Sequence, residues 1–353
     1  MDTASPVLVT GGSGFIACSL VKALLEQGHT VHTTVRSLQN QKKLAPLRDL
    51  QKTHPNKLHL FEADLLNPNS FDDAMSGCAT VHHVASPFRM PEKIKDGQRE
   101  MVEPALQGVR SVLGSVENTQ TVKRVILTSS TGAIFGTYID VPQKMENATL
   151  SEKYFNSSSS VDHEPYHYSK VMAEKEAWKL YEAQESKRWH LVAINPGLVL
   201  GPSLTPSSES GSLFLLNELL SGQLFFGVPD LSFLLVDVRD VVAAHCAAAK
   251  VNSAHGRYII SHDRTTTFQE IALTVRKHIT GFRRYLIPTH TIPTWFLRIV
   301  GPLFGLDARF IREHIGIRFV VDNKRSVSEL GINYTPLELT LQDHYASWSV
   351  NRA

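Results

Sequence analysis

The sequence predicts an α/β protein with a doubly wound parallel sheet and a smaller, mainly helical C-terminal lobe. Three observations indicate this fold. Short β-branched runs alternate with amphipathic stretches over the first two-thirds of the chain, the first such run leads directly into a glycine-rich turn, and a stretch rich in Pro, Ser and Gly follows Pro196. Repeated strand–helix–strand units are joined by right-handed crossovers, which give a parallel sheet with helices on both faces.

The expected strands are short and rich in Val, Ile and Leu, and they cover residues 6–10, 30–36, 57–62, 80–84, 124–129 and 190–194. The run Val7-Leu8-Val9 is continuously apolar, as in a strand that is covered on both faces. Helices are expected over 14–27, 98–117 and 166–185, and Gly28 is a suitable residue to end the first. Further short strands are expected near 233–236 and 257–261.

Composition excludes several classes of protein. The 353 residues include 36 Lys and Arg against 34 Asp and Glu, a net charge of +2, which argues against a nucleic-acid-binding face. Cys18, Cys78 and Cys246 form no Cys-x-x-Cys pair and lie among apolar neighbours, so we expect reduced, buried thiols in a cytoplasmic protein.

We expect no metal site, although the chain has sixteen histidines. His82 and His83 are adjacent, so they point to opposite faces of a strand. His163 and His167 have a helical spacing, but no carboxylate or thiol ligand is evident beside them.

Residues 1–6 lack the basic and apolar regions of a signal peptide. The most apolar late stretch, 292–306, is interrupted by Pro293, Arg298 and Pro302 and is shorter than the ~20 residues of a membrane span. Membrane binding is therefore not expected. We interpret the stretch as a helix pair that covers a substrate pocket, with an interfacial patch as the alternative.

A dinucleotide site is indicated by the segment Gly11-Gly12-Ser13-Gly14-Phe15-Ile16-Ala17, which follows the first strand and opens the first helix. Gly11 lets the chain turn sharply, and Gly12 and Gly14 carry no side chain where backbone must approach a pyrophosphate. Because the motif lies in a βαβ unit, it predicts a Rossmann domain. We expect this domain over 1–198, completed by about 233–264, and a substrate-binding lobe over 199–232 and 265–353.

The residues after the second strand favour NADPH over NADH. NAD-preferring sites have an acidic residue ~20 positions after the glycines, which binds the ribose 2′-hydroxyl. Here no Asp or Glu lies between Glu26 and Asp49, and Arg36 is followed by Lys42 and Lys43. Guanidinium and ammonium groups suit a 2′-phosphate, although Arg36 as a plain surface charge is the alternative. After the third strand, Asp64 either binds the adenine amino group or caps the next helix.

The catalytic candidates are Tyr166 and Lys170, which are four positions apart and share a helix face. A tyrosine is ordinarily a poor acid near neutral pH, and a neighbouring ammonium makes its phenolate easier to form. Tyr166 is then suited to protonate a carbonyl oxygen while hydride adds to the carbon. A hydroxyl from Ser129 or Ser130, at the end of the fifth strand, can hydrogen-bond the same oxygen.

With these motifs the chain resembles an extended short-chain dehydrogenase/reductase of the dihydroflavonol reductase-like and aldehyde (carbonyl) reductase group. The segments that carry the resemblance are TGGSGFIA (10–17), TVR (34–36), ADL (63–65), HVASP (83–87), LTSS (127–130), YHYSK (166–170) and NPGLVLGP (195–202). The resemblance implies Ser130 as the catalytic serine with Ser129 as the fallback, Tyr166 as proton donor, and Lys170 as the residue that positions cofactor and tyrosine. It also implies NADP(H) contacts from Gly11, Gly12, Ser13, Gly14, Phe15, Ile16, Arg36, Lys43, Asp64, Leu65, Val84, Ala85, Ser86, Pro196, Gly197 and Val199.

The chain departs from the family pattern at two positions, and the second of these bears on the substrate. The third glycine of the family is Ala17 here, and Phe135 occupies the position where plant flavonoid reductases often have an asparagine that contacts the flavonoid. Phe135 favours a more apolar pocket and a general carbonyl substrate. Phe88, Phe214, Phe225 and Phe226 are candidates for the same pocket, with ordinary core packing as the alternative.

The expected activity is NADPH-dependent reduction of a small aldehyde or ketone to an alcohol by a monomer or homodimer. Nucleotide-sugar epimerases and dehydratases of the same superfamily are an alternative, but they generally need the acidic residue that is absent after the second strand. A hydroxysteroid dehydrogenase is a second alternative, supported only by 292–306. A non-catalytic cofactor-binding protein is a third, and such relatives typically lose the Tyr/Lys pair.

Overall fold

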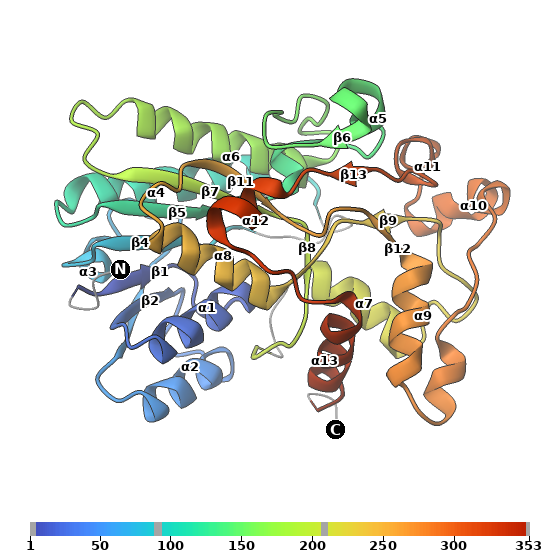
Figure 1. Ribbon diagram of the computed structural model, residues 1–353, viewed down its shortest axis with the longest axis horizontal. Coiled ribbons are helices and arrows are strands. Elements are labelled where there is room, and N and C mark those ends of the chain that lie inside the picture. The colour runs from blue at the N-terminus through green and yellow to red at the C-terminus, as the bar shows by residue number, and fades with distance from the viewer. Residues whose placement is uncertain (1–4, 88–93, 206–210, 351–353) are drawn as a thin grey trace.

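The computed structural model describes residues 5–87, 94–205 and 211–350. Its centre is a seven-stranded sheet that is parallel throughout, with strand order β11-β7-β5-β4-β1-β2-β3. Figure 1 shows helices above and below this sheet. The strands are β1 (Val7–Val9), β2 (Val31–Val35), β3 (Leu58–Glu62), β4 (Thr80–His83), β5 (Arg124–Thr128), β7 (His190–Pro196) and β11 (Gly256–Ile260). The predicted doubly wound parallel sheet is confirmed.

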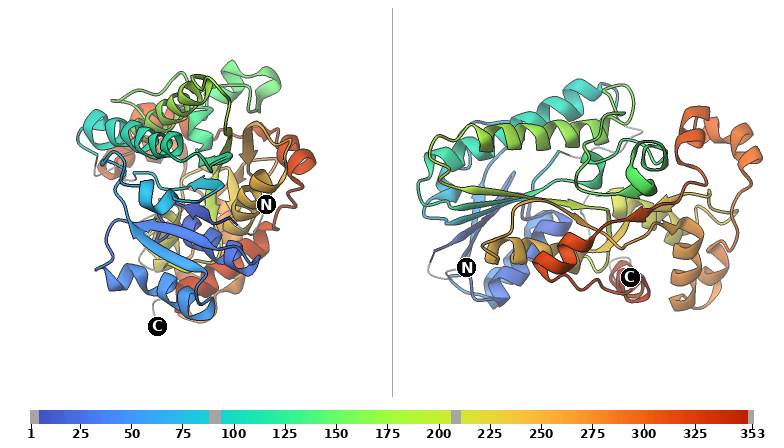
Figure 2. Two further views of the ribbon diagram at one scale, coloured as in Figure 1. Left: turned by 90° about the vertical axis from the view of Figure 1, so that its left-hand side faces the viewer. Right: turned by 45° about the horizontal axis from the view of Figure 1, so that its top comes forward.

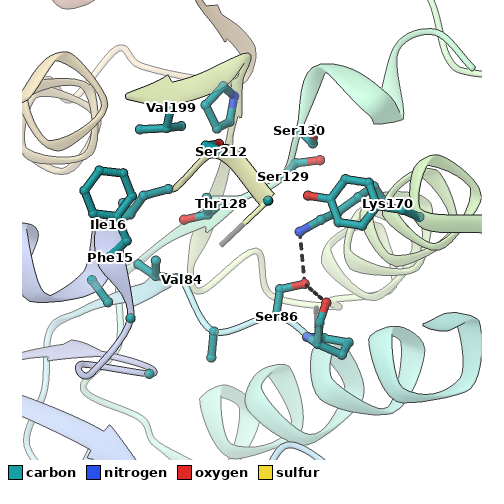
Figure 3. A pocket seen from close by; sticks show the side chains of 18 of the residues that line it. Phe15, Ile16, Val84, Ser86, Thr128, Ser129, Ser130, Lys170, Val199 and Ser212 are labelled. Carbon is teal, nitrogen blue, oxygen red and sulfur yellow. Dashed lines mark hydrogen bonds between the residues drawn. The ribbon is translucent and has the colours of Figure 1, made fainter. Parts of the chain in front are cut away.

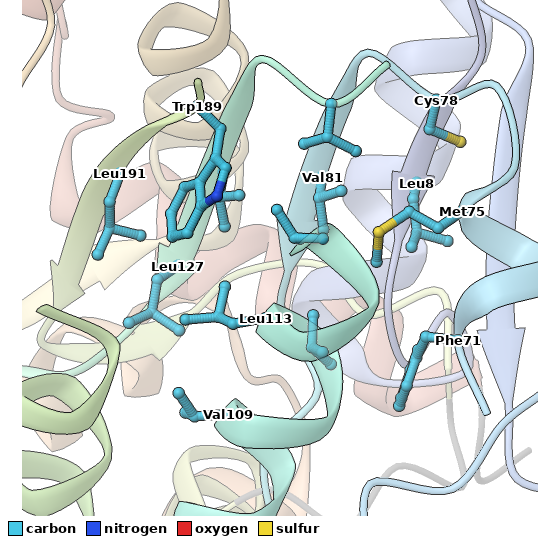
Figure 4. Close-up of a cluster of buried hydrophobic side chains, with 14 of the residues drawn as sticks. Leu8, Phe71, Met75, Cys78, Val81, Val109, Leu113, Leu127, Trp189 and Leu191 are labelled. Carbon is cyan, nitrogen blue, oxygen red and sulfur yellow. The ribbon is translucent and has the colours of Figure 1, made fainter. Parts of the chain in front are cut away.

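One face of the sheet is covered by α3 (Asp72–Met75), α4 (Glu103–Asn118) and α6 (Pro165–Glu182). Figure 4 shows the packing on this face, where Val109 and Leu113 of α4 lie near Leu127 of β5 and Leu191 of β7. These side chains are at most 6% exposed, so the strands beneath them are shielded from water. This burial explains why the strand sequences are almost entirely apolar.

The opposite face is covered by α1 (Phe15–Glu26), α2 (Gln41–Thr53) and α8 (Val238–Lys250). Leu20, Val21 and Leu24 of α1 are fully buried against Val7 and Val9 of β1. The helix ends before Gly28, whose φ of 85° is the left-handed conformation that a helix-ending glycine adopts. Since both faces are covered, the sheet edge at the strands' carboxyl ends is where a ligand can enter.

The remaining elements lie largely toward one end of the molecule (Figures 1 and 2). The helices there are α5 (Asp140–Lys144), α7 (Gly211–Ser221), α9 (Phe268–His278), α10 (Thr294–Val300), α11 (Ala308–His314) and α13 (Leu337–Val350), while α12 (Lys324–Leu330) packs near α8 and β11. Three small sheets join distant segments: β8 (Leu198–Leu200) with β10 (Leu235–Asp237), β9 (Ser232–Phe233) with β12 (Thr266–Thr267), and β6 (Thr149–Leu150) with β13 (Val320–Val321). The strand expected near 233–236 is thus two short strands in two different sheets.

Two helices differ from the expectation. The helix expected from residue 98 begins as a π-helical turn over Gln98–Val102 and becomes α-helical only at Glu103. α2 was not expected, because it is polar, contains Pro46 and buries only Leu44 and Leu47. Within the described ranges, no helix is both long and apolar enough to cross a membrane.

Candidate active site

A cleft of about 730 Å³ lies at the carboxyl ends of the parallel strands. Its walls come from the segments after β1, β2, β3, β4, β5 and β7, from the start of α6 and from α11. Figure 3 shows Phe15 and Ile16 of α1 on one side of this cleft and Lys170 on the other. The cleft therefore brings the predicted cofactor loop and the predicted catalytic helix together.

The glycine loop forms one end of the cleft. Gly11 has φ 74°, and a Cβ there would lie 3.0 Å from the Cβ of Ala85, so the residue provides both the turn and the close approach. Gly14 precedes the first residue of α1 and lines the cleft with Ser13, Phe15 and Ile16. Gly12 differs from the expectation: it is not on the cleft wall formed by the described residues, and its missing Cβ makes room for the Thr33 hydroxyl of β2 instead.

Arg36 and Lys43 are exposed and line the same end of the cleft. Between them lies Asn40, which also lines the cleft and whose side chain accepts a hydrogen bond from the Lys43 N–H at 3.2 Å. Asn40 thus caps α2 and directs its positive N-terminal end toward the cleft. The unexpected helix adds backbone donors beside the two cations that the sequence singled out.

Asp64 does not lie on the cleft wall formed by the described residues, whereas its neighbour Leu65 does. The Asp64 carboxylate accepts a hydrogen bond from the Leu66 N–H at 2.9 Å. It therefore closes the turn after β3 and caps no helix in this position.

Tyr166 and Lys170 lie on the first turns of α6, and both line the cleft. The Lys170 Nζ is 5.5 Å from the centre of the Tyr166 ring, and it donates a hydrogen bond to the Ser86 Oγ at 2.9 Å (Figure 3). The Lys170 side chain is buried, so its charge acts with little screening by water. The geometry places an ammonium beside the phenol and beside the loop after β4.

That loop is fixed by Thr10 at the end of β1. Its hydroxyl oxygen accepts hydrogen bonds from the backbone N–H groups of Val84 at 3.0 Å and Ala85 at 2.9 Å, and it lies 3.1 Å from His83 Nδ1. Burial, together with the nearby Lys170 ammonium, lowers the pKa of His83 to about 3. His83 is therefore neutral, and its Nδ1 can accept a hydrogen bond from the Thr10 hydroxyl. These contacts hold Val84, Ala85 and Ser86 on the cleft wall.

The two serines after β5 have different surroundings, although both line the cleft (Figure 3). Ser129 Oγ donates its hydrogen to the buried Glu174 Oε2 at 2.5 Å. Ser130 Oγ accepts from the Gly132 N–H at 3.1 Å, so its own hydrogen can donate into the cleft. The geometry favours Ser130 over Ser129 as the group that meets a substrate oxygen.

Glu174 is the centre of a buried polar network that the sequence did not reveal. Its carboxylate also accepts from Arg257 Nε of β11 at 2.5 Å and from Asn195 Nδ2 of β7 at 2.7 Å. Asn195 donates in addition to the Ser130 carbonyl at 3.0 Å. The network ties α6 to the end of β5, and with them the Tyr/Lys pair to Ser130.

The segment after β7 forms the third wall, where Pro196, Gly197 and Val199 line the cleft. A Cβ at Gly197 would lie 2.2 Å from the Leu234 carbonyl oxygen, so only glycine fits there. Val84, Ala85 and these residues give the cleft an apolar strip between the glycine loop and Lys170.

Of the phenylalanines expected in the pocket, the structure places one on the cleft wall and three elsewhere. Phe135 is 3% exposed and lines the cleft. Phe214, Phe225 and Phe226 are 41–62% exposed and are absent from the cleft wall formed by the described residues, so their assignment to pocket or core was wrong. Phe88 lies outside the described residues.

The cleft wall also contains residues that the sequence analysis missed, namely Tyr138, Glu164, His167, Phe233, Phe310 and His314. The late helix that lines the cleft is α11, whereas the described residues of 292–306 form α10 and a 3₁₀ turn and do not line it.

His163 precedes α6, so it does not share a helical face with His167. Carboxylates do lie beside both, with Glu313 2.9 Å from His163 and Glu164 4.0 Å from His167, contrary to the expectation. Within residues 5–87, 94–205 and 211–350, no group of three such side chains is arranged to hold a metal ion.

Comparison with known proteins gives the family. Residues 7–260 match the model of the NAD dependent epimerase/dehydratase family. A cinnamoyl-CoA reductase from Medicago truncatula is 33% identical over 96% of this chain and 93% of its own length. An anthocyanidin reductase from Vitis vinifera is 36% identical over 80% of this chain and 82% of its own.

Solved structures agree with the fold. The yeast methylglyoxal/isovaleraldehyde reductase, determined as a complex with NADPH, superposes with a TM-score of 0.79 and 26% identity over 98% of this chain and 99% of its own. The chain therefore belongs to the NAD dependent epimerase/dehydratase family of extended short-chain dehydrogenase/reductases, in a group whose compared members are reductases.

Proposed function

We propose that this protein reduces an aldehyde or ketone to an alcohol with NADPH, and that Tyr166 is the proton donor. The observation that carries the proposal is the cleft itself. Tyr166, Lys170 and Ser130 share its wall with the glycine loop and Arg36, which is the arrangement that hydride transfer from a dinucleotide to a carbonyl requires.

The residues of the cleft fit NADPH. Gly11 and Gly14 let backbone approach a pyrophosphate at the start of α1. Arg36 and Lys43 are exposed cations beside the N-terminus of α2, which suits the 2′-phosphate. The similar yeast reductase was determined with NADPH, which supports the same assignment.

The bound nicotinamide would supply hydride to the carbonyl carbon. Tyr166 would donate its phenolic proton to the carbonyl oxygen, and Ser130 would hydrogen-bond the same oxygen as negative charge develops on it. Lys170 would stabilise the phenolate left behind, because its ammonium lies 5.5 Å from the ring centre. Glu174 and Asn195 would keep α6 and the Ser130 segment in register through their hydrogen bonds.

The substrate we propose is a general carbonyl compound with an apolar or aromatic body. Phe135 and the other aromatic side chains at the far end support this, as do the reductases among the relatives. We further propose that 199–232 and 265–353 form the substrate lobe, since Gly211, Ser212 and Phe310 line the cleft from there.

The test follows NADPH absorbance with purified protein and a panel of aliphatic aldehydes, aromatic aldehydes, simple ketones and flavonoid-type ketones. The proposal predicts oxidation with at least one carbonyl compound and a higher kcat/KM for NADPH than for NADH. No oxidation with any carbonyl compound, together with interconversion of a nucleotide sugar in the presence of NAD, would replace it by the epimerase alternative.

A further inference from the structure

Among the described residues that line the cleft, Glu164 carries the only carboxylate, and aromatic side chains lie near it. Glu164 immediately precedes Pro165, the first residue of α6, and is two positions before Tyr166. Its φ and ψ are both 53°, a left-handed conformation that non-glycine residues seldom adopt. Such a conformation persists only where its surroundings hold it, and it often marks a functional site.

Two histidines lie beside the Glu164 carboxylate. Oε1 is 3.4 Å from His314 Nε2, and Oε2 is 4.0 Å from His167 Nδ1. The His167 Nδ1 also donates to the Gly136 carbonyl at 2.7 Å, which fixes the orientation of this ring. The His314 side chain is only 8% exposed and comes from the end of α11, so the Glu164–His314 pair joins α11 to the start of α6.

The charge of Glu164 follows from these neighbours. Burial alone would raise the pKa of the carboxyl group, but His314, His167 and His163 together hold it below its ordinary range. Glu164 is therefore a carboxylate at neutral pH, and a carboxylate can only accept hydrogen bonds. Its side chain is still 25% exposed and lines the cleft, so it can reach a ligand there.

Aromatic rings surround this pair. Phe310 stacks on His314 with ring centres 4.5 Å apart, and Tyr138 lies 5.3 Å from the same histidine. Phe135 is 5.9 Å from His167. All three rings line the cleft, so this part of the cavity offers aromatic faces together with the Glu164 carboxylate as a fixed acceptor.

We propose that Glu164 and His314 form a specificity subsite, in which the Glu164 carboxylate accepts a hydrogen bond from a hydroxyl group on an aromatic carbonyl substrate. This rests on the proposed function, because the ligand is the substrate of that reaction. A substrate that has a carboxylate in place of the hydroxyl is rejected, since it would bring a second negative charge against a partly buried one. His314 is a positioning residue that holds Glu164 in its left-handed conformation.

The experiment compares three ring substituents on one carbonyl framework. Benzaldehyde, para-hydroxybenzaldehyde and para-carboxybenzaldehyde are assayed for kcat/KM, and benzylacetone with its para-hydroxy analogue extends the reach of the probe. Calorimetric titration of the same compounds into protein saturated with NADP⁺ measures binding without turnover. Glu164→Gln keeps the size of the side chain and removes the charge.

In Glu164→Gln the amide oxygen can still accept a hydrogen bond, but the charge that strengthens the bond is gone, which predicts a drop of about fivefold to tenfold in kcat/KM and affinity for at least one hydroxylated compound. The kcat/KM and affinity for benzaldehyde and benzylacetone should change by less than about threefold. The affinity for para-carboxybenzaldehyde should rise relative to benzaldehyde. His314→Gln should reproduce the selectivity change in part. Glu313→Gln is the matched control, because Glu313 pairs with His163, Arg309 and Arg312 and is not among the residues that line the cleft.

Two results would overturn the subsite. The first concerns the ratio of kcat/KM, and of affinity, for a hydroxylated compound to that for its unsubstituted parent. If these ratios are equal in wild type and Glu164→Gln, and both proteins give the same thermal unfolding curve, Glu164 does not bind the hydroxyl group. The other is failure of every hydroxylated compound to bind wild type more tightly than its unsubstituted parent. Turnover of benzaldehyde and benzylacetone by wild type distinguishes the proposed reductase activity from the proposed Glu164 subsite. These compounds have no hydroxyl group, so their reduction tests the activity without involving Glu164.

Discussion

The Lys170 ammonium donates a hydrogen bond to the Ser86 hydroxyl at 2.9 Å, and this bond joins the catalytic helix α6 to the loop after β4. Ser86 follows the loop residues that Thr10 fixes from the end of β1. The proposed proton donor, the glycine loop and the apolar strip between them are thus held by one connected set of contacts. Several consequences of this arrangement can be measured.

Arg36→Ala should raise KM for NADPH by about tenfold or more, because a charge-assisted contact to the 2′-phosphate is lost. KM for NADH should change far less, since NADH has no phosphate at that position. Steady-state kinetics with both cofactors checks the difference. An equal increase in KM for both cofactors would mean that Arg36 does not bind the 2′-phosphate.

Ser130→Ala and Ser129→Ala should separate catalysis from folding. Ser130→Ala removes a donor to the carbonyl oxygen and should lower kcat by about 10²-fold or more. Ser129→Ala leaves that donor in place but takes one from the buried Glu174 carboxylate, so it should lower the free energy of unfolding with a smaller effect on kcat. Urea unfolding and kcat are measured for both variants, and the reverse pattern would make Ser129 the catalytic serine.

Glu174→Gln should destabilise the protein by about 3–5 kcal/mol, because it leaves the Arg257 guanidinium buried without its carboxylate partner. Glu176→Gln is the control on the same helix, where the partner Arg110 is 51% exposed. Glu176→Gln should lower the free energy of unfolding by less than about 1 kcal/mol. Urea unfolding measures both, and similar losses would show that the Glu174 network contributes no more than a surface ion pair.

Buried histidines should make the protein sensitive to acid. Burial lowers the pKa of His245 to about 3, and it holds the pKa of His82 well below its ordinary value. Unfolded histidines have a pKa of ~6.5, so between these values the unfolded state binds more protons. Stability is therefore fully present above pH ~6.5 and is lost as the pH falls toward 3, at up to about 1.4 kcal/mol per pH unit for each histidine.

His245→Gln should make this pH slope shallower by about one histidine's contribution. Urea unfolding of wild type and variant at several pH values between 7 and 4 gives the two slopes. Parallel slopes would show that burial does not lower the pKa of His245 in the folded protein.

The sequence alone was sufficient for the sheet, for the glycine loop and for the Tyr/Lys pair on the cleft wall. The strand pattern, the glycine loop and the Tyr/Lys pair are local signals, and each lies in the element that its pattern indicated. α2 escaped detection because only Leu44 and Leu47 of its residues are buried, which leaves no clear apolar face.

Long-range partners were out of reach for a different reason. Glu174 and Arg257 are 83 positions apart, and neither residue carries a local sign of the other. The same holds for Glu164 and His314, whose pairing depends on how α11 folds back over the cleft. Phe225 and Phe226 were predicted to lie in the pocket or the core, but both are exposed. Aromatic character alone does not tell whether a residue faces a pocket or solvent.

The most direct test of Tyr166 as the proton donor is the variant Tyr166→Phe, which removes one hydroxyl group and keeps the ring. NADPH oxidation is measured with the best carbonyl substrate of wild type, and NADPH affinity is measured by calorimetry on the same samples. Proton donation by Tyr166 predicts a loss of turnover of about 10²–10⁴-fold, with NADPH affinity unchanged within about twofold. Turnover at the wild-type rate in Tyr166→Phe would contradict it.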